Sequence, residues 1–203
     1  MKKFLPVLLF LSVILMLSCS THKFLNKDVN PKGKIAVIIG DTKLKSENAL
    51  YADNFSQALK AGSTLSVLSQ KQVKSTLGSY PERIKGPYKI VGVDEQPKPD
   101  YSLRDMDSLA AIAKKLNVQY LYTFWIPQAI HAKQAGSEAV QYWYVAELIE
   151  FPSRRIIAQG DMNMIYIIKG NTAGPMPRSA EDMCKYFSEI VAKEIIENIG
   201  ISR

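Results

Sequence analysis

The sequence predicts an α/β fold, a mixed β-sheet with helices packed on it, in one domain that covers residues 34–203. Three observations lead to this class. Short β-branched runs alternate with segments of helical periodicity in the first half of the chain. Two long apolar runs flank a compact turn at 151–154, and the chain closes on its clearest amphipathic helix, at 179–199.

The first half of the domain alternates strand and helix. A β-branched run ended by Gly40 predicts a buried strand, and apolar residues at helical spacing predict the next helix, with Gly62 as its stop. A second short strand leads into Ser69, which can cap a short helix that ends at Gly78. The expected ranges are 34–39, 46–61, 64–68 and 69–77.

The middle of the chain is irregular, because prolines prevent a long helix between residues 78 and 101. Residues 88–93 are the strand-like piece of this segment. Ser102 and Asp105 then form a capping-box pattern that opens a helix ending at Leu116.

Three strands and a helix complete the domain. Residues 119–126 are almost continuously apolar, which is typical of a strand covered on both faces. Residues 140–149 and 155–168 are expected to form an antiparallel hairpin around the turn. Ser179 caps the closing helix, whose apolar residues repeat at helical spacing.

The first residues of the chain predict export. Lys2 and Lys3 precede an apolar stretch from Phe4 to Leu17, which is shorter than the roughly 20 residues that a membrane-spanning helix needs. Leu15-Met16-Leu17-Ser18-Cys19 resembles the lipobox of bacterial lipoproteins. Residues 1–18 are therefore expected to be a cleaved signal peptide and Cys19 the lipid-modified start of the mature chain.

Residues 19–33 are expected to be the lipidated cysteine and a flexible tether. Ser20 to Gly33 is polar and has no apolar period, and His22 within it has no obvious partner. Removal of the signal peptide takes two lysines from a chain of formal net charge +7. The remaining basic residues are scattered, which does not favour nucleic-acid binding.

The elements of the domain resemble the amino-terminal domain of TolB and its lipoprotein relatives, LpoB and the curli-secretion lipoprotein CsgG. The resemblance covers most of residues 34–199. Its pieces are Lys34-Ile35-Ala36-Val37, Leu65-Ser66-Val67-Leu68-Ser69, Ala111-Ile112-Ala113-Lys114-Lys115-Leu116-Asn117-Val118-Gln119-Tyr120-Leu121, and Val145-Ala146-Glu147-Leu148-Ile149 followed by a turn and Arg155-Ile156-Ile157.

The resemblance implies a periplasmic module that docks on proteins. LpoB-like members activate cell-wall synthases, and CsgG-like members assemble an export pore with added membrane-crossing strands. Here residues 127–138 are expected to be a loop between two core strands. One membrane-crossing strand alone needs about 9–11 residues, so this loop argues against such a pore.

The sequence offers few groups for catalysis or metal binding. His131 is expected in a loop, without the Gly-x-Ser-x-Gly elbow of a hydrolase. Asp94 with Glu95 is a weak carboxylate pair, more typical of a solvated turn. Cys184 falls on the buried face of the closing helix, where a thiol acts as a small hydrophobe. No catalytic residue, cofactor or metal site is therefore predicted.

Two further patterns allow a structural and a functional interpretation. Gly40-Asp41-Thr42 follows the first strand, where an α/β sheet can bind a ligand, but a plain loop is favoured because no glycine-rich motif is present. Tyrosines alternate along 119–122 and 141–144. Pairing of these rings within the sheet is favoured over an exposed aromatic face for a partner.

The resulting expectation is a non-catalytic protein-interaction or assembly module, anchored by lipid and facing the periplasm from the outer membrane. Its partners would be envelope proteins and the membrane, not nucleic acid. The alternatives are a small-ligand binder that uses the loops near Asp41 and Asp94, or a subunit of an export assembly. The first surface expected to bind a partner is the irregular segment with Tyr80, Tyr88, Lys98 and Tyr101.

Overall fold

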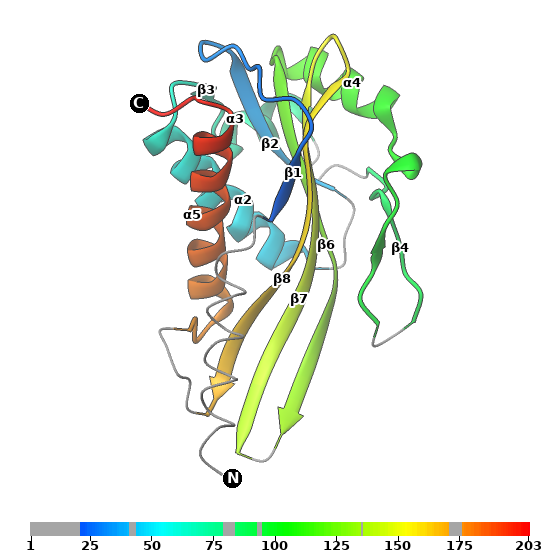
Figure 1. Ribbon diagram of the computed structural model, residues 1–203, viewed down its shortest axis with the longest axis vertical. Coiled ribbons are helices and arrows are strands. Elements are labelled where there is room, and N and C mark those ends of the chain that lie inside the picture. Colours follow the sequence, from blue (N-terminus) through cyan, green and yellow to red (C-terminus); the bar gives the residue numbers. More distant parts are fainter. Residues whose placement is uncertain (1–20, 41–43, 79–83, 93–94, 135, 171–175) are drawn as a thin grey trace.

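The protein is described by a computed structural model for residues 21–40, 44–78, 84–92, 95–134, 136–170 and 176–203. A mixed sheet with strand order β1-β8-β7-β6-β2-β3 forms its centre (Figure 1). This architecture confirms the predicted α/β class. The strands are β1 (His22–Phe24), β2 (Lys34–Ile39), β3 (Ser66–Val67), β6 (Tyr120–Gln134), β7 (Ser137–Glu150) and β8 (Arg155–Lys169).

The sheet has a parallel part and an antiparallel part. β2 runs parallel to both β3 and β6. β6, β7 and β8 form an antiparallel meander, which confirms the predicted late hairpin, and β1 joins the free edge of β8. The lower ends of β6, β7 and β8 extend beyond the helices as a long ribbon (Figure 1).

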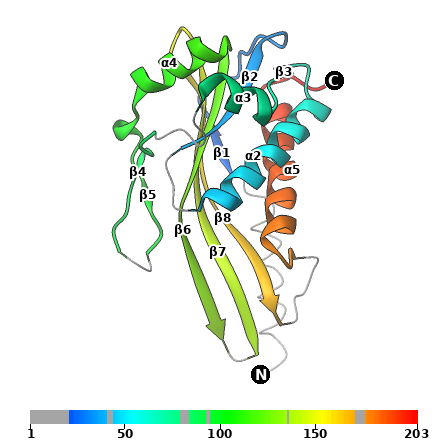
Figure 2. The same cartoon turned by 180° about the vertical axis from the view of Figure 1, so that it is seen from behind.

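Helices cover both faces of the upper sheet (Figure 2). On one face lie α2 (Lys45–Gly62) and α5 (Ala180–Asn198), and on the other lie α3 (Gln70–Leu77) and α4 (Met106–Leu116). Ser69 caps α3 with a full capping box, and Ser179 caps α5 by accepting from the backbone N–H of Asp182. These local signals explain why the helices were predictable.

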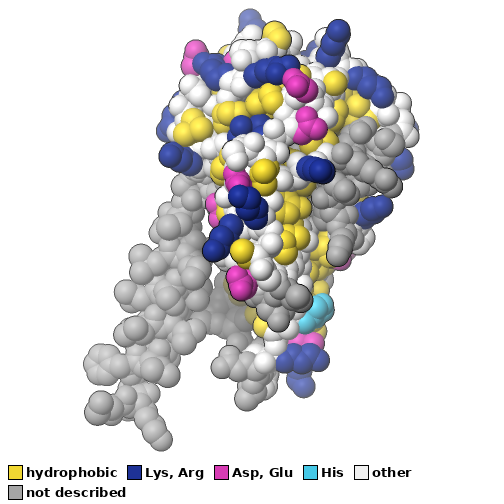
Figure 3. Space-filling model, turned by 90° about the vertical axis from the view of Figure 1, so that its right-hand side faces the viewer, with side chains coloured by type: hydrophobic (Ala, Val, Ile, Leu, Met, Phe, Trp, Pro, Cys, Tyr) yellow, Lys and Arg dark blue, Asp and Glu magenta, His cyan; other side chains and the backbone are white. Residues whose placement is uncertain are grey.

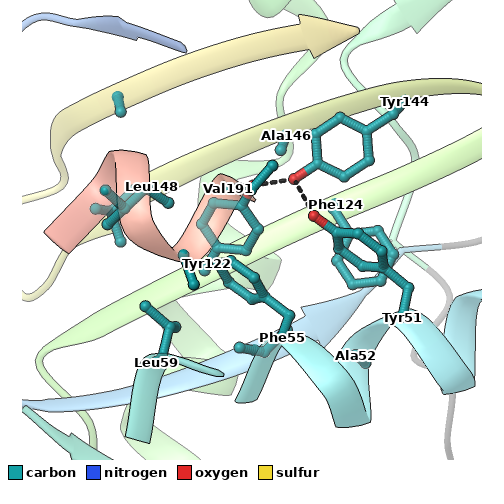
Figure 4. Packing of buried hydrophobic residues seen from close by; sticks show 14 of the residues in the cluster. Tyr51, Ala52, Phe55, Leu59, Tyr122, Phe124, Tyr144, Ala146, Leu148 and Val191 are labelled. Atoms are coloured by element: carbon teal, nitrogen blue, oxygen red, sulfur yellow. Dashed lines mark hydrogen bonds between the residues drawn. The ribbon is translucent and has the colours of Figure 1, made fainter. Parts of the chain in front are cut away.

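Aromatic side chains fill the core beneath α2 and α5 (Figure 4). The ring centroids of Phe55 and Tyr122 are 4.4 Å apart, and Tyr51 meets the ring of Phe124 edge-on at 4.7 Å. The hydroxyls of Tyr51 and Tyr122 both hydrogen-bond the hydroxyl of Tyr144. The alternating tyrosines therefore pair within the sheet, as favoured, and do not form an exposed aromatic face.

Residues 127–138 are not the expected loop. β6 continues to Gln134 and β7 begins at Ser137, so the two strands carry on through this range. The pairing of β6 with β7 shifts register between Trp125 and Gln128. Pro127 occupies this irregularity, where a strand tolerates a residue without a backbone N–H. The expected short loop, and the argument that rested on its length, were wrong.

The entry to α4 also differs from its prediction. Tyr101–Leu103 forms a 3₁₀ turn, η1, and α4 begins only at Met106. Asp105, not Ser102, is the cap, since its carboxylate accepts from the backbone N–H of Ser108 at 3.1 Å. Before this turn, β4 (Tyr88–Lys89) pairs with β5 (Lys98–Pro99). β4 is shorter than the strand expected at 88–93.

The expected flexible tether is partly a strand. His22–Phe24 forms β1, in which His22 pairs with Gly160 and Phe24 with Ala158. The Leu25 and Asn26 amides both donate to the carbonyl of Ile157, and Val29 is buried in the core. Residues 22–29 thus pack on the sheet and do not form a free tether.

Candidate interaction surface and anchor site

A hollow with apolar walls lies beside β4, where the ribbon leaves the helical layers. Its lining comes from three places: the residue before α2, the three residues after β4, and β6 at its register shift. Figure 3 views the side on which β4 lies in Figure 1 and shows hydrophobic side chains exposed along the middle of that face. The lining residues are Leu44, Ile90, Val91, Gly92, Pro127, Gln128 and Ala129.

The two most exposed apolar residues of the hollow are Ile90 and Val91. Their exposed fractions are 61% and 50%, whereas most large apolar side chains of the described chain are buried. Sequence reasoning named tyrosines of this segment and missed these two. Their signal was present, because two adjacent β-branched residues stand within a polar, proline-rich stretch.

The segment that carries Ile90 and Val91, residues 84–104, is fixed to the sheet at its first residue through Trp125. Its indole N–H donates to the carbonyl of Ile84 at 2.9 Å, and both side chains are buried. Gly40 makes room for the ring, since a Cβ at that position would lie 1.6 Å from the indole nitrogen. Gly40 is therefore explained by packing. Asp41 and Thr42, which completed the alternative ligand loop, lie outside the described residues.

The last residue of this segment, Arg104, is fixed by a buried ion pair. Glu147 on β7 has no exposed surface, and its Oε1 accepts from the Arg104 guanidinium and from the Gln159 amide at 3.3 Å. The ring of Tyr101 lies 5.9 Å from the guanidinium carbon. Burial, and then the nearby carboxylate of Asp161, raise the pKa of Tyr101 above its ordinary value, so its phenol stays protonated.

Three of the four predicted surface residues lie in the described part of this segment. Lys98 is exposed on β5, while Tyr88 and Tyr101 are half-buried, and the ring of Tyr88 packs against the core beneath α3 and α4. Tyr80 lies outside the described residues. The segment therefore both packs over the sheet and exposes apolar side chains.

A second constellation holds β1 against α5. The backbone N–H of His22 donates to Glu194 Oε1 at 3.0 Å, and the His22 ring lies 3.3 Å from Glu194 Oε2 through Nδ1 and 3.0 Å from the Tyr122 hydroxyl through Nε2. Thr21 also donates to Glu194. Burial raises the pKa of Tyr122 well above its ordinary value, so its hydroxyl keeps its proton. His22 was predicted to have no partner, and that was wrong.

Gly160 is the reason that β1 can lie so close to β8. A Cβ at this position would lie 2.5 Å from the carbonyl oxygen of Thr21 and 2.6 Å from the His22 ring. Cys19, the predicted lipid attachment site, lies outside the described residues but only three residues before His22.

Reactive groups are sparse in the described chain. His131 is exposed on β6, not in the loop that was expected. Cys184 is fully buried on α5, as predicted, and burial raises the pKa of its thiol to about 12. Among the described residues, no three His, Cys, Asp or Glu side chains gather as a metal site. Asp94 lies outside them.

None of the helices in the described residues is long and apolar enough to cross a membrane. No family model matches the chain, and no curated protein matches its sequence.

Solved structures with a similar fold include bacterial lipoproteins. Lipoprotein GNA1162 from Neisseria meningitidis has a TM-score of 0.50 at 9% identity, over 81% of this chain and 99% of that chain. A PelC dodecamer from Paraburkholderia phytofirmans has a TM-score of 0.46 at 12% identity, over 86% and 98%. The LpoB C-terminal domain from Salmonella enterica has 0.38 at 16%, over 68% and 86%. At such identities, the likeness to GNA1162 establishes the fold alone.

Proposed function

We propose that this chain is a lipid-anchored envelope protein that works as a non-catalytic protein-interaction or assembly module. Residues 1–18 are its export signal, and Cys19 carries the acyl chains that attach it to the membrane. We further propose that it faces the periplasm from the outer membrane, in cell-envelope biogenesis or in the regulation of a cell-wall synthase. The lipobox-like residues 15–19 and a fold similar to that of lipoprotein GNA1162 support the anchor.

The exposed pair Ile90 and Val91 carries the interaction role. Apolar side chains that line a hollow and are exposed by half or more of their area are typical of a protein-binding site. The hollow stands on a rigid base, because Trp125 and Glu147 fix the segment at each end. The two fixed ends limit the conformational entropy that the segment between them loses when a partner binds.

The anchor is tested by metabolic labelling of cells with a radioactive fatty acid. The wild-type protein is expected to take up the label and to sediment with membranes, and Cys19→Ser is expected to do neither. An unlabelled wild-type protein, or a Cys19→Ser form that still sediments with membranes, would contradict the proposal.

The interaction surface is tested by photo-crosslinking in whole envelopes. A photoreactive residue at Ile90 or Lys98 is expected to capture an envelope protein, and the Val91→Asp change is expected to abolish capture from Ile90 without unfolding the domain. Lys71, exposed on α3, is the matched control position. Capture at Lys71 but not at Ile90 would place the partner elsewhere.

A further inference from the structure

The lipid anchor and β1 are separated by very little chain. His22 is fixed in the sheet opposite Gly160, and the predicted attachment site, Cys19, is three residues earlier. A fully extended chain spans at most about 3.6 Å per residue, so the Cα atoms of Cys19 and His22 lie within about 11 Å of each other. Only two residues, Ser20 and Thr21, separate the predicted attachment site from β1.

β1 is held firmly enough to transmit this constraint. It shares backbone hydrogen bonds with β8, Gly160 gives it space, and Glu194 of α5 binds both Thr21 and His22. β1 is therefore joined to both β8 and α5.

The outer edge of β1 suits a lipid headgroup layer. Lys23 and Leu25 alternate with the inward His22 and Phe24, so they lie on the sheet face opposite α5; both are exposed, and the exposed fraction of Leu25 is 44%. Lys27, also exposed, lies on the α5 side, since its Nζ donates to the Asn198 side chain at 3.2 Å and lies 5.7 Å from the centre of the Phe24 ring. Lysines on both sides of this edge, with an apolar side chain between them in the sequence, match a surface with apolar depth and anionic headgroups.

From this geometry we propose that the sheet edge formed by β1 rests on the phospholipid bilayer that holds Cys19. The occupant of this face is the membrane itself, with Lys23, Leu25 and Lys27 at headgroup level. The inference rests on the proposed lipidation of Cys19. β6 lies on the other side of β7 from β8 and carries part of the hollow, so the hollow is held at the edge of the ribbon far from the anchor.

The test uses the full lipidated protein in vesicles of phosphatidylethanolamine and phosphatidylglycerol with a nitroxide on the headgroup. A fluorophore is attached to Leu25→Cys, or to Lys98→Cys and Lys71→Cys as distant controls, while native Cys184 is buried. Quenching is expected to be several-fold stronger at position 25 than at 98 or 71. Inserting ten Gly and Ser residues after Ser20 extends the reach by roughly 17 Å and is expected to reduce the difference.

The outcomes separate the two proposals. A purified protein whose mass shows no acyl addition overturns the proposed anchor. A lipidated protein that is quenched equally at positions 25, 71 and 98 overturns the bilayer contact alone. Strong quenching at position 25 both with and without the inserted linker supports the contact and shows that the surface itself, rather than the short connection, maintains it. A label at position 25 that is shielded from aqueous iodide but not quenched by the lipid nitroxide also overturns it, and indicates a second copy of the chain on this face.

Discussion

Residues 22–33 and residues 84–104 both combine several lysines and polar side chains with proline and glycine, yet the structure holds them differently. The first segment is tied along its length. β1 pairs with β8, the Asn30 amide donates to the Tyr120 hydroxyl at 2.8 Å, and Val29 is buried. The second is tied at its ends, through Ile84 and Arg104, and exposes Ile90 and Val91 between them.

The difference lies in what each segment meets. Residues 22–24 meet an open strand edge with a glycine opposite His22, so their backbone polar groups are satisfied by the sheet. The backbone of residues 88–89 pairs with residues 98–99 of their own segment, in a ladder too short to be stable by itself. Composition alone does not decide between a strand and a loop; the available partner does.

The largest expected effect is at the fixed end of the second segment. Arg104→Ala is expected to lower the free energy of unfolding by about 3–5 kcal/mol, because it leaves the carboxylate of Glu147 buried without its cation. Chemical denaturation measures the change. The paired variant Arg104→Met with Glu147→Met is expected to recover most of the loss, and a double variant as unstable as the single one would show that packing, not charge, is responsible.

The next effect tests the first segment. Gly160→Ala is expected to lower the free energy of unfolding by about 1–3 kcal/mol and to release β1, because its Cβ would overlap the Thr21 carbonyl. Hydrogen exchange of the Leu25 and Asn26 amides, which donate to Ile157, should accelerate. Lys23→Ala, on the outward side, is the control and should leave exchange unchanged. Unchanged exchange in Gly160→Ala would mean that β1 is not held by this fit.

The helices and β1 show what can and cannot be predicted from the sequence. The helices and most core strands were predictable because their signals are local, such as the cap at Ser69, the apolar period of α5 and the β-branched run of β2. The location of β1 depends on Gly160 and Glu194, far away in the chain. Its own residues carry no sign of that contact.

The interaction surface was predictable in part for the same reason. Prolines marked residues 78–101 as irregular, and Tyr88 and Lys98 lie in the segment that borders the hollow. The β6 wall was missed, because Pro127 and the polar residues after it suggest a loop. The structure instead places the proline at a register shift within a long strand. A single acidic residue in an apolar run, Glu147, was a further sign that sequence reasoning did not use.

The comparison predicts a difference in local opening between the segments. Exchange at Leu25 and Asn26 is expected to be slow, since their amides donate to the sheet. Ile90 and Val91, which follow a two-residue ladder, should exchange rapidly. Native-state hydrogen exchange read by mass spectrometry would measure both. Equal protection of the two segments would contradict the account of a segment tied only at its ends.

The smallest effect concerns the exposed ion pair of the second segment, Lys89 with Asp100, whose Nζ and Oδ2 atoms are 2.6 Å apart. The Lys89 ammonium, followed by the Ser102 hydroxyl, lowers the pKa of the Asp100 carboxyl below its ordinary 3.8. Because the folded-state pKa is depressed, the pair stabilises the fold above pH 3.8 and loses this contribution as the pH falls through the folded value. Lys89→Ala is expected to leave the unfolding midpoint at pH 7 unchanged, since exposed pairs contribute little. It should nevertheless move the NMR titration of Asp100 upward, and a titration that stays in place would assign the lowered pKa to Ser102 alone.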